Sequence, residues 1–243
     1  MLGLMQDQPL LVSALIEFAA RHHADAEIVS RRVEGDVHRY TYAEAAARSR
    51  QVARALDRLG LQFSDRVGTL AWNGYRHFEL YFGVSGSGRV VHTINPRLSP
   101  EQVAWIASHA EDQVLCFDMT FLPIIKAIWP QCKTVKHWIA LCEDDALPAD
   151  TGIAGLQSYE AWIGSEAATY DWPDFDERSA CALCYTSGTT GRSKGAMLSH
   201  GNMLSNAQVL RKYWGWQPDD VLIHALPIFH VHGLFVAIHG ALI

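Results

Sequence analysis

The chain has 243 residues, of which 49% are hydrophobic and 19% are charged. This composition supplies a core for one large domain or two small ones and excludes an intrinsically disordered protein. The formal net charge of −6 argues against a nucleic-acid partner. The charge is uneven, because residues 178–243 contain five Lys and Arg but two Asp, and residues 178–218 contain no carboxylate. A positive stretch in an acidic chain favours an anionic ligand at that stretch, such as a phosphate.

Five cysteines stand mostly in apolar runs, and an odd number of this kind predicts reduced, buried thiols in a cytoplasmic protein. Cys181 and Cys184 have the CxxC spacing of metal and redox sites. They belong to the apolar run ACALCY, which has the composition of a strand, where residues three apart point to opposite faces. We therefore expect no metal or redox role for this pair.

Apolar runs occur at both ends of the chain. Residues 1–18 have no basic segment and include Asp7 and Glu17, so no signal peptide is predicted. Residues 221–243 are long enough to span a bilayer, but they contain four His, Pro227 and two Gly, and polar side chains are costly inside a membrane. A buried strand, a loop and a buried helix therefore account for this run better than a transmembrane segment does.

Several predicted helices begin or end at characteristic residues. Thr41 and Glu44 form a capping box ahead of an apolar stripe, and Gly60 ends that helix. Asn73 is expected to cap the next helix. Ser99 opens a further helix, with Pro at its first position and Gln at its third.

Strand-like runs alternate with these helices along the whole chain. Such alternation predicts an α/β fold with a parallel or mixed sheet flanked by helices. The acidic connection at residues 165–179 is the expected boundary between two subdomains. The predicted helices cover residues 9–21, 41–60, 73–88 and 121–129 and segments that begin near 99, 202 and 233; the predicted strands cover residues 65–72, 89–96, 112–118, 134–142, 180–185 and 220–226.

Two glycine-rich stretches have the composition of phosphate-binding loops. The first, GVSGSGRVV at residues 83–91, lacks the third glycine of GxGxxG, so its small residues are expected to let a helix pack closely. The second, YTSGTTGRSKGAMLSH at residues 185–200, departs from the Walker pattern, because Ser193 replaces its second glycine and Gly195 its hydroxyl residue. Flexible glycines, Ser and Thr hydroxyls and Lys194 make an anion nest for nucleotide phosphates the preferred interpretation.

The second stretch also satisfies GxSxG, the nucleophile elbow of serine esterases. In that interpretation Ser193 is the nucleophile, Asp219 or Asp220 is the acid and His230 is the base. An elbow holds its serine at a tight turn from a strand into a helix, whereas the apolar strand here ends near Tyr185, well before the serine. The esterase is therefore the alternative enzyme.

The run YTSGTTGRSKG at residues 185–195 resembles the phosphate-binding signature of the adenylate-forming (AMP-binding) superfamily, which includes the acyl-CoA synthetases. Ser193 departs from that signature, because the family usually has Pro before the Lys. LPIFHVHG at residues 226–233 and TINPRLSPEQ at residues 93–102 resemble two further motifs of the family. The resemblance implies the fold of the N-terminal part of these synthetases, an α/β fold with mixed or parallel sheets flanked by helices.

The resemblance implies an enzyme that joins a small carboxylic acid to ATP. The carboxylate attacks the α-phosphate to give an acyl-adenylate and pyrophosphate, and the thiol of coenzyme A then displaces AMP; Mg²⁺ is expected with the ATP. By resemblance, His230 is the catalytic residue beside the substrate carboxylate and the α-phosphate. His224, His232 and His239 lie near it in sequence without acids or cysteines, so no metal site is expected. The residues implied to hold the β- and γ-phosphates are Thr186, Ser187, Gly188, Thr189, Thr190, Gly191 and Lys194.

The resemblance also implies that residues 1–243 are part of an AMP-binding domain. Residues 1–182 resemble medium- and long-chain fatty-acyl-CoA ligases, and residues 183–243 are closer to malonyl-CoA synthetases. The later motifs of the family are absent, so we expect the chain to be incomplete and inactive alone, with its last apolar helix deprived of packing partners. Three alternatives stay open: the serine esterase, a nucleotide-binding remnant without catalysis, and malonate in place of a fatty or short-chain acid.

Overall fold

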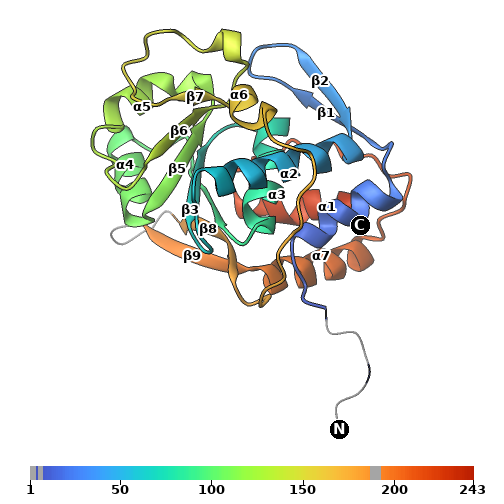
Figure 1. Ribbon diagram of the computed structural model, residues 1–243. Coiled ribbons are helices and arrows are strands. Elements are labelled where there is room, and N and C mark those ends of the chain that lie inside the picture. The colour runs from blue at the N-terminus through green and yellow to red at the C-terminus, as the bar shows by residue number, and fades with distance from the viewer. Residues whose placement is uncertain (1–3, 5–7, 187–192) are drawn as a thin grey trace.

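Helices cover both faces of a seven-stranded sheet (Figure 1). The computed structural model describes residue 4, residues 8–186 and residues 193–243. The strand order is β7-β6-β5-β3-β4-β8-β9, and every neighbouring pair is parallel except β8 with β9. The predicted α/β fold with a mixed sheet is confirmed. The strands of this sheet are β3 (Arg66–Leu70), β4 (Val90–Thr93), β5 (Asp112–Phe117), β6 (His137–Ala140), β7 (Gln157–Ser158), β8 (Ala180–Thr186) and β9 (Lys194–Ser199).

Each face of the sheet has its own apolar core. In β5, Val114 and Cys116 belong to one core while Leu115 and Phe117 belong to the other, because successive strand residues point to opposite faces. Helices α1, α2, α3, α6, α7 and α8 contribute to the first core, and α4 and α5 contribute to the second. The helices are α1 (Ser13–His22), α2 (Tyr42–Arg58), α3 (Tyr75–Gly86), α4 (Pro100–His109), α5 (Leu122–Ile128), α6 (Tyr159–Gly164), α7 (His200–Trp214) and α8 (Ile238–Leu242), with short 3₁₀ turns η1 (Met119–Phe121) and η2 (Asp144–Ala146) and the π-helical segment η3 (His232–Ala237).

The predicted helix ends are confirmed at three places. The Glu44 backbone N–H donates to Thr41 Oγ1 at 3.3 Å, and the Thr41 N–H donates to the Glu44 carboxylate at 2.7 Å. Ser99 caps α4 by the same arrangement. Gly60 follows α2 with a φ of +78°, a left-handed conformation that glycine adopts without a Cβ clash.

The glycine-rich run at residues 83–91 brings two helices together, as predicted. A Cβ on Gly83 would lie 2.5 Å from Val52 Cβ and 2.7 Å from the Ser49 carbonyl oxygen, so α3 approaches α2 more closely than any larger residue allows. Gly88 has a φ of +80° and turns the chain from α3 towards β4. The run therefore has a packing role.

Two sequence expectations are wrong. Residues 220–226 have the composition of a strand but form no strand, because they find no partner among the residues that the structure describes, and isolated strands are not stable. Asn73 does not cap α3, whose N-cap is Gly74. Its side chain instead bonds the backbone at Leu226 and Ile228.

Several elements were not predicted. The antiparallel hairpin of β1 (Glu27–Arg31) and β2 (Val37–Thr41) is half exposed and has no apolar alternation in its sequence. The short β7 and α6 lie between the strand predicted at residues 134–142 and the acidic connection at residues 165–179, and β9 lies within the stretch expected to be a phosphate-binding loop. The expected boundary at residues 165–179 is an irregular segment between α6 and β8 and stays a prediction.

The last apolar helix has packing partners, contrary to expectation. Leu234, Phe235 and Leu242 are each at most 2% exposed and belong to the same core as α1, α2 and α3. The Tyr42 hydroxyl donates to the Ala241 carbonyl at 3.1 Å, which fixes the end of α8 to the start of α2. No helix within the described ranges is long and apolar enough to cross a membrane.

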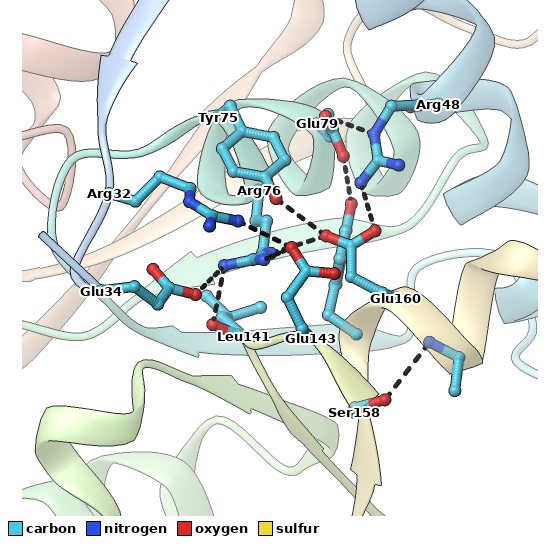
Figure 2. A network of polar contacts seen from close by, with 12 residues as sticks. Arg32, Glu34, Arg48, Tyr75, Arg76, Glu79, Leu141, Glu143, Ser158 and Glu160 are labelled. Carbon is cyan, nitrogen blue, oxygen red and sulfur yellow. Dashed lines mark hydrogen bonds and ion pairs between the residues drawn. The ribbon is translucent and has the colours of Figure 1, made fainter. Parts of the chain in front are cut away.

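A network of charged residues joins distant segments beside α3 (Figure 2). Arg76 is buried and contacts Glu160 at 2.7 Å and Glu34 at 2.8 Å. Arg48 contacts Glu79 at 2.8 Å, and the Glu79 side chain is fully buried. Each buried charge thus has an opposite partner, which burial demands. The network ties the β1–β2 hairpin, α2 and α6 to α3.

We expect Glu79→Ala to lower the free energy of unfolding by about 3–5 kcal/mol, because the variant removes one partner of a buried ion pair. Urea denaturation measures this quantity. Glu27→Ala is the matched control, since Glu27 pairs with Arg39 on an exposed part of the hairpin and its loss should matter far less. Equal losses in the two variants would contradict the importance of the network.

Buried neutral histidines make the stability depend on pH. Burial lowers the pKa of His77 and of His200 to about 4 and that of His239 to about 3, whereas the unfolded chain protonates near 6.5. Between these values the unfolded state binds more protons, so stability present above pH 6.5 is lost as the pH falls towards 4. His239→Gln removes one of these groups, and its unfolding free energy should depend less steeply on pH in urea titrations at pH 7, 6 and 5. Identical slopes for variant and wild type would show that His239 contributes nothing to the effect.

Candidate functional site

The carboxyl ends of the parallel strands β3, β4, β5 and β8 lie along one edge of the sheet. Ligands of open α/β sheets bind at this edge, where the connections that leave the strands gather. Asn73 follows β3, Arg97 follows β4 and Asp118 follows β5. The predicted phosphate loop follows β8. The motifs at residues 93–102 and 185–195 are therefore neighbours in space.

The phosphate loop is the tip of an antiparallel hairpin made by β8 and β9. Thr186 and Lys194 are the register pair nearest the tip, and Thr186 Oγ1 donates to the Lys194 carbonyl oxygen at 3.4 Å. Both residues are exposed. The other predicted phosphate-binding residues lie outside the described residues, so their roles stay predictions; they are Ser187, Gly188, Thr189, Thr190 and Gly191.

Lys194 carries a positive charge that the described protein does not neutralise. Residues 179–218 contain no Asp or Glu, and no described carboxylate from elsewhere forms an ion pair with Lys194. An exposed cation of this kind, next to the Thr186 hydroxyl, suits a polyanionic ligand.

The absence of a side chain at Gly195 matters for packing between β8 and β9, which the sequence alone did not indicate. The φ of Gly195 is not left-handed, so backbone freedom does not explain the glycine. A Cβ at this position would lie 2.9 Å from Leu183 Cδ1 and 3.3 Å from Tyr185 Cζ. The glycine therefore lets the side chains of β8 lie flat across β9.

A cluster of aromatic and histidine side chains supports the base of the hairpin. The Tyr185 hydroxyl is 2.6 Å from His109 Nδ1, and Trp105 stacks on His109 with ring centroids 4.7 Å apart. His92 lies 5.2 Å from the Tyr185 ring, and its Nδ1 is 2.8 Å from Asp112 Oδ2, with both side chains fully buried. These residues come from α4, β4, β5 and β8, so no local sequence pattern could have indicated the cluster.

His230 lies in a turn directly before η3. Its N–H donates to the Pro227 carbonyl at 3.2 Å, and its own carbonyl accepts from the Leu234 N–H at 3.0 Å, so the backbone is fixed on both sides. The residue is exposed, and its ring contacts Phe229 with centroids 4.7 Å apart. No side-chain hydrogen bond joins the imidazole to a described residue, so both ring nitrogens are available to a ligand.

Asn73 brings this turn to the carboxyl edge of the sheet. Asn73 Nδ2 donates to the Leu226 carbonyl at 2.8 Å, and the Ile228 N–H donates to Asn73 Oδ1 at 2.9 Å. Asn73 follows β3, and β4 alone separates β3 from β8. The motif at residues 226–233 therefore lies on the same edge of the sheet as the β8–β9 hairpin, called the phosphate hairpin below.

A groove of about 1140 Å³ adjoins this edge. Strand β1, the end of α8 and residues 216–229 bound it, and Trp72, Phe229 and Arg97 are among its lining residues. Neither Thr186 nor Lys194 lines it. The groove therefore lies beside the histidine turn and apart from the phosphate hairpin.

The structure removes the esterase alternative. Ser193 directly precedes β9, so the chain passes from a strand through a loop into an antiparallel strand. A nucleophile elbow passes from a strand directly into a helix, and the next helix here, α7, begins only at His200. Ser193 is therefore not held in an elbow.

Metal-binding side chains do not gather anywhere within the described ranges. No group of three or more His, Cys, Asp or Glu is placed to hold a metal ion there, so His224, His232 and His239 form no such cluster with His230. His239 is instead buried with its Nε2 2.8 Å from the Tyr81 hydroxyl. The five cysteines are free and buried, as predicted.

Comparison with known proteins agrees with these motifs. The family described as AMP-binding enzyme matches residues 16–243. The chain is 48% identical over 236 residues to the 3-methylmercaptopropionyl-CoA ligase of Ruegeria lacuscaerulensis, and 42% identical over 239 residues to the medium-chain-fatty-acid–CoA ligase of Ectopseudomonas oleovorans. Each match covers 96% of this chain and 43% of the relative. The chain thus spans less than half the length of these relatives.

Solved structures show the same arrangement. Apo MatB from Rhodopseudomonas palustris is 33% identical with a TM-score of 0.76, and the match covers 95% of this chain and 43% of that one. The anthranilate CoA ligase AuaEII in complex with anthranoyl-AMP shares the fold with a TM-score of 0.81 at 23% identity, over 98% of this chain and 45% of that one. The family match over nearly the whole sequence and the similarity to named acyl-CoA ligases show that the chain belongs to the AMP-binding enzyme family.

Proposed function

We propose that the chain binds ATP at the β8–β9 hairpin and that the protein to which it belongs converts a carboxylic acid to an acyl-adenylate and then to an acyl-CoA. The observation that carries this proposal is that two groups without a polar side-chain partner among the described residues lie along the same edge of the sheet. One is the cation of Lys194 at the β8–β9 hairpin, and the other is the imidazole of His230.

The chemistry needs charge neutralisation more than covalent participation by the protein. Thr186, Lys194 and the loop between them would hold the β- and γ-phosphates. The acid carboxylate attacks the α-phosphorus and pyrophosphate leaves; the thiolate of coenzyme A then attacks the acyl carbon and AMP leaves. The His230 imidazole would donate a hydrogen bond to the oxygens of the carboxylate or α-phosphate, where negative charge accumulates. Mg²⁺ would neutralise further phosphate charge, and we assign no protein ligand to it.

The names of the relatives support a small acid as the substrate. Ligases for 3-methylmercaptopropionate and for medium-chain fatty acids match 96% of this chain, which favours a fatty or short-chain acid. Malonate is the alternative, since the malonyl-CoA synthetases share the hairpin and histidine motifs. A second candidate function is nucleotide binding without catalysis, because the chain spans 43% of the length of these relatives. Free, buried thiols at all five cysteines support a location in the cytoplasm.

Lys194→Ala should weaken ATP binding about ten- to a hundred-fold. Charge-assisted contacts to phosphate are each worth about 1.5–3 kcal/mol, and 1.4 kcal/mol corresponds to a tenfold change in affinity. Calorimetric titration with MgATP measures the effect. Lys212→Ala removes an exposed lysine from the last turn of α7 and serves as the control. Absence of ATP binding by the wild type would contradict the proposed function, and equal affinities of wild type and Lys194→Ala would contradict only the role of this lysine.

The proposed reaction predicts AMP release that requires ATP, Mg²⁺, coenzyme A and an acid together. We expect none from residues 1–243 alone, and release once they are joined to the remaining part of the Ruegeria lacuscaerulensis ligase. In the joined protein His230→Ala should lower the rate about a hundred- to a thousand-fold, as the loss of one donor at the developing charge does. An acid series from malonate to decanoate identifies the substrate. Release by residues 1–243 at ordinary enzyme rates would refute the requirement for further sequence.

A further inference from the structure

The Asn73 side chain forms hydrogen bonds with a segment that is distant in sequence. It stands between β3 and α3, yet it leaves that helix uncapped by a side chain and bonds Leu226 O and Ile228 N on the far segment. The amide carries its NH₂ donor group and its carbonyl acceptor in one plane, so the two bonds form together in a single orientation of the side chain. Both partners are backbone atoms. The bonds therefore fix the path of the chain and do not select side chains at residues 226 and 228.

The segment that leads to the bonds with Asn73 has little support of its own. Residues 221–225 form neither helix nor strand, and within the described residues none of the backbone–backbone hydrogen bonds involves them. Val221 and Ile223 are 87% and 90% exposed, so their side chains do not anchor the segment either. Within the described residues, the first hydrogen bonds that hold the chain after residue 220 are thus the two bonds to Asn73.

The neighbour of Asn73 strengthens the same attachment. The Trp72 ring meets Phe229 edge to face with centroids 6.0 Å apart, and Phe229 is 3% exposed. The backbone N–H of Trp72 donates to Asp118 Oδ2 at 2.6 Å, which ties Trp72 to the carboxyl end of β5. Residues 226–229 therefore rest on a support built from the ends of two adjacent strands.

The other side of the histidine turn is also fixed. A Cβ on Gly233 would lie 2.1 Å from the Pro227 carbonyl oxygen, so η3 begins in direct contact with the turn. His230 stands between this contact and the bonds to Asn73. The backbone at His230 is thus held from two sides, and among the described residues Asn73 is the side chain that joins this turn to the sheet by hydrogen bonds.

We propose that Asn73 is a positioning residue, which holds residues 226–228 against the end of β3 and so sets where His230 stands relative to the phosphate hairpin. This inference rests on the proposed function, in which His230 meets the α-phosphate. Asn73 touches no reacting atom; it acts through the backbone of the histidine turn.

Hydrogen exchange at the Ile228 amide tests the attachment directly. In Asn73→Ala the amide loses its acceptor and should exchange about three- to tenfold faster, as the net value of one hydrogen bond implies. Asn73→Asp keeps an acceptor but not the donor, so it should retain protection at Ile228. Asn206→Ala, on the exposed side of α7, is the control and should exchange like the wild type. Unchanged exchange in Asn73→Ala would overturn the proposal.

The effect on His230 is read from the NMR signals of its ring nitrogens as MgATP is added. We expect a response in the wild type and in Asn206→Ala, and a response at least twofold smaller in Asn73→Ala at unchanged ATP affinity, since Lys194 is untouched. If Asn73 only stabilised the fold, Asn73→Ala would lower the ATP affinity or the unfolding midpoint and would not reduce the His230 response at unchanged ATP affinity. No response in the wild type would contradict the proposed function, and a full response in Asn73→Ala would overturn the positioning role alone.

Discussion

Parallel pairing of β8 with β4 is the interaction on which the site depends. The register joins Val91 to Ala182 and Thr93 to Cys184, so both strands end at the same edge of the sheet, with β8 continuing beyond β4 to Thr186. The phosphate hairpin therefore emerges beside the segment that follows β4 and one strand away from the end of β3. Without this pairing, a motif late in the sequence would have no fixed relation to residues more than a hundred positions earlier.

Polar groups buried beneath this edge are arranged in partnered sets. His92 and Asp112 lie under Tyr185, and Gly68 makes room for them, since a Cβ there would be 2.7 Å from Asp112 Oδ2. The charges of Arg76 and its glutamates lie around the start of α3 on the other face (Figure 2). Burying such groups is costly unless each has a partner, so the polar sets restrict the ways in which the helices can dock on the sheet.

The elements that sequence analysis predicted correctly are those with a local physical cause. Thr41 and Ser99 cap helices through residues three positions away, and the β5 run is apolar because both of its faces are buried. The motifs at residues 185–195 and 226–233 indicated the family because each is continuous in sequence. The α/β class followed from the order of such local signals.

The remaining features depend on contacts across the chain. The strand expected at residues 220–226 lacks a partner, and Asn73 looked like a cap because an Asn before a helix usually is one. The support of Tyr185 by His109 joins residues 76 positions apart. The last helix is buried because Tyr42 and Tyr81 reach it from α2 and α3, and neither tyrosine carries a local mark of that role.

The contacts that hold the turn at His230 also determine which positions near it tolerate substitution. Asn73 contacts only backbone atoms at Leu226 and Ile228, so hydrogen bonding leaves those side chains free to vary with the adjoining groove. Gly233 is constrained, because a Cβ there would strike the Pro227 backbone, whereas a Cβ at Gly195 would require only the Leu183 side chain to shift. Substitutions of the side chains at residues 226 and 228 would therefore leave the two bonds to Asn73 in place, whereas a side chain at position 233 would displace the backbone at Pro227.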